Sequence, residues 1–126
     1  MRDDAVPGAI ERYRQTLAEM ADLRGDQGFV SSSRRWDRLV DRLREDETEV
    51  CSSAEGREAV LALLSDPRPT VRVWAATAAL PWDEEQARPV LVAVREDPTR
   101  YGLNSINAKH TLVAFDAGRP GPSAAG

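Results

Sequence analysis

The chain has 126 residues, of which 41% are hydrophobic and 30% charged, and its formal net charge is −4 at pH 7. These values predict one globular domain and exclude wholesale disorder, a collagen-like chain and a membrane span. A single cysteine, Cys51, excludes an intramolecular disulfide and a cysteine-based zinc site, and the acidic balance disfavours nucleic acid and anionic lipid as partners. Because the first residues lack the apolar stretch of a secretory signal, we expect a cytoplasmic protein.

Apolar residues recur at helical spacing along the whole chain, whereas the alternation typical of strands is rare, so the sequence predicts an all-α fold. The first helix is expected over residues 7–24, because Pro7 suits a first helical turn and apolar residues follow on one face. The second helix is expected over 31–49, where any of the serines in 31–33 would serve as its N-cap.

The middle of the chain predicts two helices joined by a tight turn. The third helix is expected over 54–65, since Ser52 and Glu55 have the spacing of a capping box. The Asp66-Pro67 dipeptide ends it, and an alanine-rich fourth helix is expected over 70–80.

The last third of the chain predicts two more helices. The fifth is expected over 84–96, where Asp83 and Gln86 form a capping pair and Pro89 falls in or just beyond the first turn. The sixth is expected over 104–116 and is closed by a glycine.

An internal repeat becomes visible when the chain is shifted by 31 residues, because residues 57–67 then align with 88–98 and both segments end in Asp-Pro. Each unit is predicted as a helix, a turn and a second helix, and such pairs bury their apolar faces by stacking on one another. We therefore expect one helical domain over residues 1–117. Residues 118–126 lack large apolar side chains and are expected to form a flexible tail.

Residues 63–80 resemble a HEAT repeat, with a leucine-rich first helix, an Asp-Pro turn, a Val-Arg pair and an Ala-Ala-rich second helix. The second unit keeps Asp97-Pro98 but has Gly102-Leu103 in place of Val-Arg. Over most of its length the chain is also similar to a family of small bacterial HEAT-like proteins catalogued as a domain of unknown function. The resemblance implies a short right-handed α-α superhelix of about six helices in three antiparallel pairs, capped by the first two helices.

Charged residues in two places have a structural interpretation. Asp66 and Arg72 form an opposite-charge pair across a tight turn, and in HEAT-like repeats such residues tie the turn to the next helix. Arg34, Arg38 and Arg42 form the densest basic stripe, which is the one feature typical of nucleic-acid binding. Interleaved acidic residues neutralise much of this stripe through pairs four residues apart, so we interpret it as a solvated helix face.

His110 and Cys51 are the candidate reactive groups. As the only histidine, His110 excludes a two-histidine metal site, and its helical neighbours Ile106 and Val113 place it at the edge of the core as a structural residue. Cys51 lies at a helix boundary and is interpreted as a small buried hydrophobe. The sequence therefore predicts no catalytic residues, no metal site and no cofactor.

Aromatic and acidic residues near the predicted loops are the best candidates for contacts with a partner. Trp82 and Tyr101 fall in loops between helices, where aromatic side chains commonly anchor protein interfaces, although packing in the core is the simpler interpretation. The predicted partner-binding residues are Trp82, Tyr101, Asp83, Glu84, Glu85 and Trp74.

The leading hypothesis is a non-catalytic helical-repeat module that binds another protein. One form of it is a bacterial immunity or inhibitor protein that neutralises a basic toxin or enzyme, since complementary charge accelerates association. A resemblance to HEAT-like DNA glycosylases suggests instead a nucleic-acid-binding or DNA-repair domain, which would depend on the arginine stripe. The third hypothesis is a small enzyme that uses His110 with a carboxylate.

Overall fold

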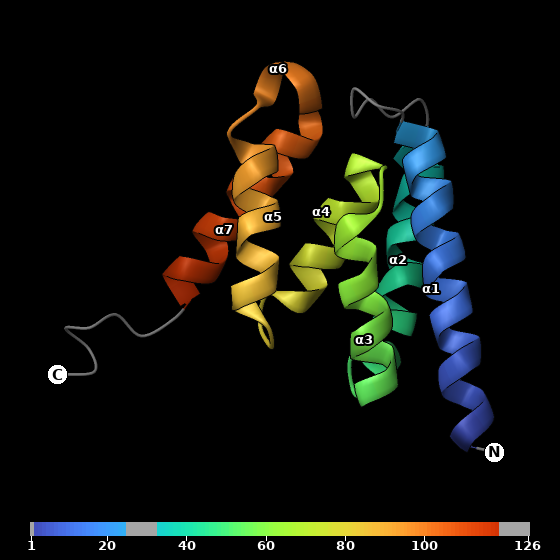
Figure 1. The fold of residues 1–126 in the computed structure, drawn as a ribbon. Helices are drawn as coiled ribbons and strands as arrows, with labels where there is room; N and C mark the ends of the chain where they lie inside the picture. The colour runs from blue at the N-terminus through green and yellow to red at the C-terminus, as the bar shows by residue number, and fades with distance from the viewer. Residues whose placement is uncertain (1, 25–32, 119–126) are drawn as a thin grey trace, which may run out of the picture.

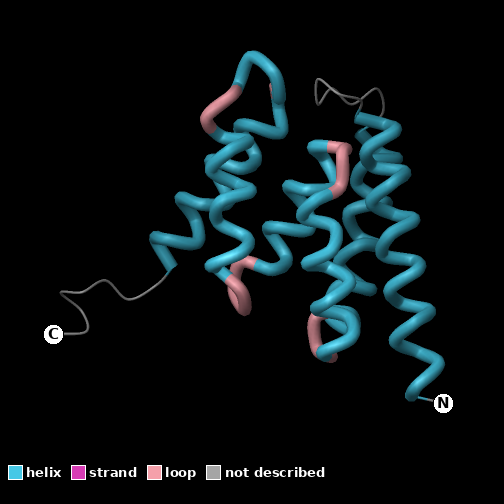
Figure 2. The backbone as a smooth tube through the Cα atoms, viewed as in Figure 1, coloured by secondary structure: helices cyan, strands magenta, loops and turns pink. Residues whose placement is uncertain are grey.

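The structure is a computed structural model that describes residues 2–24 and 33–118, and within these ranges it is all-α, as the sequence predicts. Seven α-helices and one 3-10 turn are found there, with no strand (Figure 2). The elements are α1 (Arg2–Arg24), α2 (Ser33–Val50), α3 (Ala54–Ala62), η1 (Leu63–Ser65), α4 (Pro69–Ala79), α5 (Glu84–Arg95), α6 (Pro98–Tyr101) and α7 (Leu103–Gly118).

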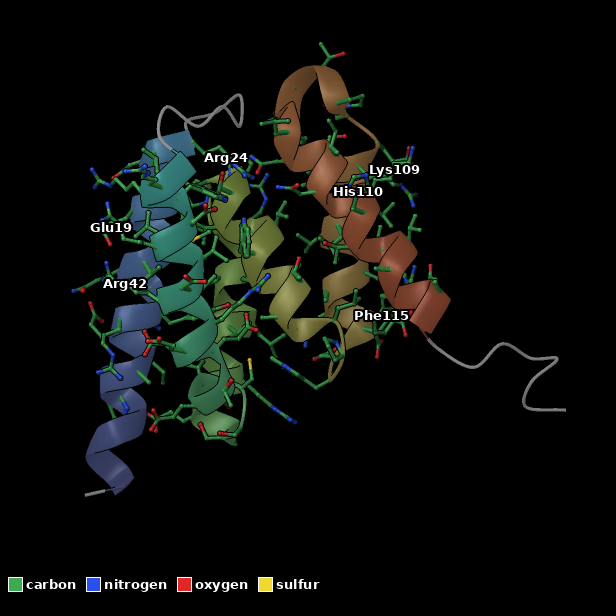
Figure 3. All side chains as sticks on the ribbon, turned by 180° about the vertical axis from the view of Figure 1, so that it is seen from behind. Glu19, Arg24, Arg42, Lys109, His110 and Phe115 are labelled. Atoms are coloured by element: carbon green, nitrogen blue, oxygen red, sulfur yellow. The ribbon has the colours of Figure 1, made fainter. Side chains whose placement is uncertain are left out.

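The helices pack as successive pairs, α1 with α2, α3 with α4, and α5 with α7. In Figure 1 the helices α1, α3 and α5 lie toward the viewer, and Figure 3 shows α2, α4 and α7 from the opposite side. One face of the molecule is therefore made of the first helices of the pairs, and the opposite face is made of the second helices. Helix α4 contacts α1, α3, α5 and α7, so it is the central element.

The core follows from this arrangement. From α1, the side chains of Tyr13, Leu17 and Met20 are buried, as the helical spacing of these residues requires. Helix α4 contributes small residues, which let its neighbours approach closely. Its buried residues are Thr70, Val71, Val73, Ala75, Ala76, Ala78 and Ala79.

The start of one helix and the N-cap of another differ from those predicted. Helix α1 begins at Arg2, so Pro7 lies inside the helix, beyond the first four residues, and removes one backbone hydrogen bond of the helix. The N-cap of α3 is Ser53, not Ser52: its hydroxyl accepts a hydrogen bond from the Gly56 N–H at 3.0 Å. Of the serines predicted to cap α2, Ser31 and Ser32 lie outside the described residues.

The C-terminal half contains one element that the periodicity does not predict. A single helical turn, α6, is capped by the Asp97 side chain, which accepts from the Arg100 N–H at 3.3 Å. It ends at Gly102, whose φ of 53° is accessible mainly to glycine. The predicted cap of α5 is confirmed, because Asp83 accepts from the Gln86 N–H at 3.2 Å, while Pro89 lies inside this helix. Helix α7 continues to Gly118, and residues 119–126 of the predicted tail lie outside the described residues.

Gly56 is required where α3 crosses the end of α2. A Cβ atom placed on it would lie 1.8 Å from the carbonyl oxygen of Val50, which is backbone and cannot rotate away. The two helices therefore cross at a distance that only glycine permits.

We predict that Gly56→Ala lowers the free energy of unfolding by about 2 kcal/mol, because the added methyl group forces the two backbones apart. Gly8→Ala is the matched control. Its Cβ would meet only the flexible end of Arg12 at 3.3 Å, so helix propensity should leave its stability unchanged or raise it by up to about 1 kcal/mol. Urea unfolding measures both, and equal stability of the two variants would show that α2 and α3 do not cross as described.

Candidate binding groove

A groove of about 450 Å³ lies on the face formed by α2, α4 and α7. Helix α2 supplies Trp36 and Val40, α4 supplies Val73 and Trp74, and α7 forms the opposite wall. The two indole rings are 5.9 Å apart with an interplanar angle of 69°, an edge-to-face contact that holds both rings in place. The floor of the groove is therefore aromatic and apolar.

Arg24, the last residue of α1, reaches into this groove and is only 8% exposed. Its guanidinium carbon lies 3.9 Å from the centroid of the Trp36 ring, close enough for a strong cation–π contact. Figure 3 shows Arg24 on the side of the groove opposite His110 of α7. A positive charge is thus held against an aromatic ring between three helices.

A buried polar network fixes the guanidinium. Arg24 Nη1 donates to Asn104 Oδ1 at 3.2 Å, and Asn104 Nδ2 donates to the Thr70 hydroxyl at 3.2 Å. These residues come from α1, α7 and α4, so the network joins all three pairs of helices at one end of the groove. Since both Asn104 and Thr70 are buried, loss of either partner would leave unpaired polar groups.

Two residues that line the groove each have a buried hydrogen-bond donor without a partner among the described residues, Arg24 Nε and Trp74 Nε1. No ion pair between Arg24 and a described carboxylate is present; Asp37, also on the groove, is exposed to solvent. Burial therefore lowers the pKa of Arg24 to about 10. The groove therefore contains a desolvated cation and hydrogen-bond donors without partners among the described residues. A ligand that accepts hydrogen bonds would complement them.

The placement of His110 differs from that predicted. Its side chain is exposed and lines the groove from α7, and its neighbours Ile106 and Val113 are 47% and 59% exposed. These apolar residues lie on the solvent-exposed face of α7. Their helical spacing therefore identifies residues of that face and does not place His110 at the edge of the core. Within the described residues His110 makes no hydrogen bond to a carboxylate.

Three of the predicted contact residues lie at the turn between α4 and α5 and are engaged within the protein. Trp82 is half-buried, with the guanidinium of Arg57 5.0 Å from its ring centroid. Asp83 caps α5, and Glu84 accepts from Arg88 at 2.7 Å. Glu85 is exposed on the first turn of α5.

The other two aromatic candidates lie far from this turn. Tyr101 is in α6, at the opposite end of α5, where Arg72 donates to its hydroxyl at 3.4 Å (Figure 1). Trp74 lies in the groove. The structure thus does not gather the predicted residues into one surface, and of them only Trp74 lines the groove.

Arg24 and Trp36 are the groove residues that sequence reasoning missed as binding candidates. The sequence places Trp36 on the apolar face of a helix, but whether that face meets the core or a groove depends on α4 and α7. Arg24 carries no local signal, because its partner Asn104 is 80 residues away.

The charge pairs differ in detail from those predicted. The Asp66 carboxylate pairs with Arg68 at 2.9 Å, and this contact is the main reason that its pKa is lowered. Arg72 instead donates to the backbone carbonyls of Asp66 and Pro67, at 2.9 and 3.1 Å, so it does tie the turn to α4.

In the arginine stripe, Arg42 pairs with Glu19 of α1 at 3.7 Å, a contact between helices and not within one. Arg34 and Arg38 are exposed on α2, as expected for a solvated face. Figure 3 shows Arg42 and Glu19 on the side of the molecule away from α7.

Cys51 is half-buried after the end of α2. Burial raises the pKa of its thiol, and the nearby Glu47 carboxylate raises it further. Because the thiolate is the nucleophile, both effects make Cys51 less reactive.

No cluster of His, Cys, Asp or Glu suited to a metal ion is present in the described part of the chain. No helix among residues 2–24 and 33–118 is long and apolar enough to cross a membrane. Comparisons with protein-family models, with curated proteins and with solved structures found no match. The groove is therefore interpreted from its own geometry.

We predict that Arg24→Met changes the free energy of unfolding at pH 7 by no more than about 1 kcal/mol. The lowered pKa corresponds to an unfavourable desolvation on the order of 3 kcal/mol, which nearly offsets the lost hydrogen bond from a charged group and the lost desolvated cation–π contact, about 2 kcal/mol each. Guanidinium unfolding measures the difference, with Arg38→Met, an exposed arginine, as the control. A loss above about 3 kcal/mol would show that Arg24 is needed for folding.

The difference in stability between Arg24→Met and the unmodified protein should depend on pH. The pKa of Arg24 is lower in the folded protein than that of a free arginine, so the penalty for its charge is fully present at neutral pH and declines as the pH rises above about 10. The stability of Arg24→Met relative to the unmodified protein should therefore decrease above about pH 10. Groups common to both proteins cancel in the comparison, and a stability difference independent of pH would contradict the assigned cause.

Proposed function

We propose that this protein is a non-catalytic helical-repeat module that binds a segment of another protein in the groove between α2, α4 and α7. The observation that carries the proposal is that Arg24, Trp36 and Trp74 meet there with two spare hydrogen-bond donors. Arginine and tryptophan dominate the binding energy of protein interfaces, and the volume of about 450 Å³ accommodates a few side chains.

The proposal includes a HEAT-like α-α superhelix, which is supported by equivalent contacts in the two repeat units. Val60 and Leu91, related by the 31-residue shift, are both fully buried. Arg57 lies over Trp82, which follows α4, and its equivalent Arg88 lies 5.9 Å from the ring of Phe115 near the end of α7. The same arginine thus connects the first helix of each unit to an aromatic ring at the end of the second.

Stacked repeats present the second helices of successive pairs side by side, which gives a surface suited to an extended partner segment. Here those helices are α2, α4 and α7, which line most of the groove. The proposal places the protein in the cytoplasm, where a free thiol such as Cys51 is stable.

The second candidate is neutralisation of a basic toxin or enzyme by an acidic surface outside the groove. It is supported by the net charge of −4 and by the exposed carboxylate of Glu85 at the start of α5. The engagement of Asp83 as a helix cap leaves it less suited to a partner.

We predict that peptides selected from a random library against the protein bind in the groove. Thr111→Arg places a long side chain on the α7 wall and should weaken their binding at least about tenfold, whereas Ala93→Arg on the exposed face of α5 should not. Fluorescence of Trp36 and Trp74 measures the affinity.

Glu85→Arg separates the two candidate functions. If this variant loses binding and Thr111→Arg retains it, the partner is held by the acidic surface and the groove is not the site. If the library yields no peptide sensitive to Thr111→Arg, the proposed function is wrong.

A further inference from the structure

We infer that the groove recognises an acidic side chain, Asp or Glu, of the partner segment, and that Arg24 is the residue that binds its carboxylate. The inference rests on the proposed function and adds the chemistry of the ligand. Its basis is the position of Arg24, a buried guanidinium aimed into the groove and held by a neutral amide in place of a carboxylate.

The first step of the argument concerns charge. A buried cation is expensive unless it is paired, and unpaired buried arginines are rare in proteins. Arg24 has the Trp36 ring on one side and Asn104 Oδ1 as its one hydrogen-bond acceptor among the described residues. A carboxylate that entered the groove would supply the missing charge in an environment with little water, where the attraction is strong.

The second step concerns hydrogen bonds. Arg24 Nε and Trp74 Nε1, the unpartnered buried atoms of two residues that line the groove, are both donors. A guanidinium binds a carboxylate through two parallel N–H donors, and Nη1 is already used by Asn104. Because a carboxylate accepts through two oxygens, it is the common protein group best matched to this set.

The third step concerns access. Arg24 is only 8% exposed and lies beside Trp36, so a carboxylate must arrive on a side chain that reaches past the indole. The chain-terminal carboxylate lacks such a stem, and for this reason we assign an internal Asp or Glu. Apolar residues of the groove, Val40 and Val73, would contact the methylene groups of that stem.

Among the described residues, the rim of the groove does not provide this carboxylate. Asp37 is exposed and makes no ion pair with Arg24 among the described contacts. The cause of the lowered Arg24 pKa is burial. Arg44, also on the groove, adds a second positive charge near its opening.

The experiment uses three libraries of random twelve-residue peptides. The first contains all residue types and has amidated C-termini, the second omits Asp and Glu and has amidated C-termini, and the third omits Asp and Glu but has free C-termini. We expect the first library alone to yield peptides whose binding is weakened by Thr111→Arg. In a selected peptide, changing the key Asp or Glu to Asn or Gln should lower the affinity at least about tenfold.

Arg24 variants test the assignment of the residue. Arg24→Met should lower the affinity for the acidic peptide by at least about tenfold and should bind the acidic and amide peptides equally, whereas Arg24→Lys should retain part of the preference. Unfolding measurements on the same variants exclude loss of structure as the cause. The control Arg38→Met should bind as the unmodified protein does.

The outcomes separate the inference from the proposed function. If the second library yields groove binders as often as the first, the groove remains a binding site but the inferred recognition of a carboxylate is wrong. If the third library yields groove binders and the second does not, the groove recognises a chain-terminal carboxylate, and the inferred recognition of an Asp or Glu side chain is wrong. If no library yields a binder sensitive to Thr111→Arg, both the inference and the proposed function fail.

Discussion

The close packing of small residues on α4 is the constraint on which the rest of the structure depends. Ala75, Ala76 and Ala79 have no exposed surface, and α4 is the helix that contacts members of all three pairs. Larger side chains there would separate the pairs, because protein interiors have no free volume to absorb them. The groove depends on the same helix, since Val73 and Trp74 of α4 form its floor. Stability of the stack and shape of the groove are therefore set together.

For Arg24, in contrast, what would favour binding is unfavourable for folding. Burial destabilises the charged form of Arg24 and so lowers its pKa, and among the described residues the Asn104 side-chain oxygen and the Trp36 ring partly compensate. Residues that are unfavourable for folding and preorganised for a ligand are common at binding sites. In this protein the cost is confined to one end of the groove, where Thr70 and Asn104 are held between helices.

Helical periodicity was sufficient to predict the fold class and the six longer helices, because each buries one face against its neighbours. It did not predict α6, since one turn carries no period and depends on the Asp97 cap and on Gly102. The 31-residue repeat aligns Arg88 with Arg57, but it does not predict what either side chain contacts. The contacts of both residues with aromatic rings depend on the ends of the following helices.

The candidate site was largely beyond the sequence. Trp74 was predicted as a contact residue from its type, but Arg24 is close to Asn104 only in the folded chain. The interpretation of His110 was wrong because the spacing of Ile106 and Val113 identifies a helix face without saying whether another helix covers it. The face of α7 that carries Ile106 and Val113 has no neighbour among the described residues, so apolar spacing on α7 has a different meaning from the same spacing on α4.

The edge-to-face pair of Trp36 and Trp74 has an optical consequence. Two indoles with centroids 5.9 Å apart and planes at 69° are close enough for their excited states to couple, which produces a paired signal in the circular dichroism spectrum. The rings come from different helices, so the signal depends on the relative position of α2 and α4. The protein thus carries a built-in spectroscopic reporter of its groove, readable without any attached dye.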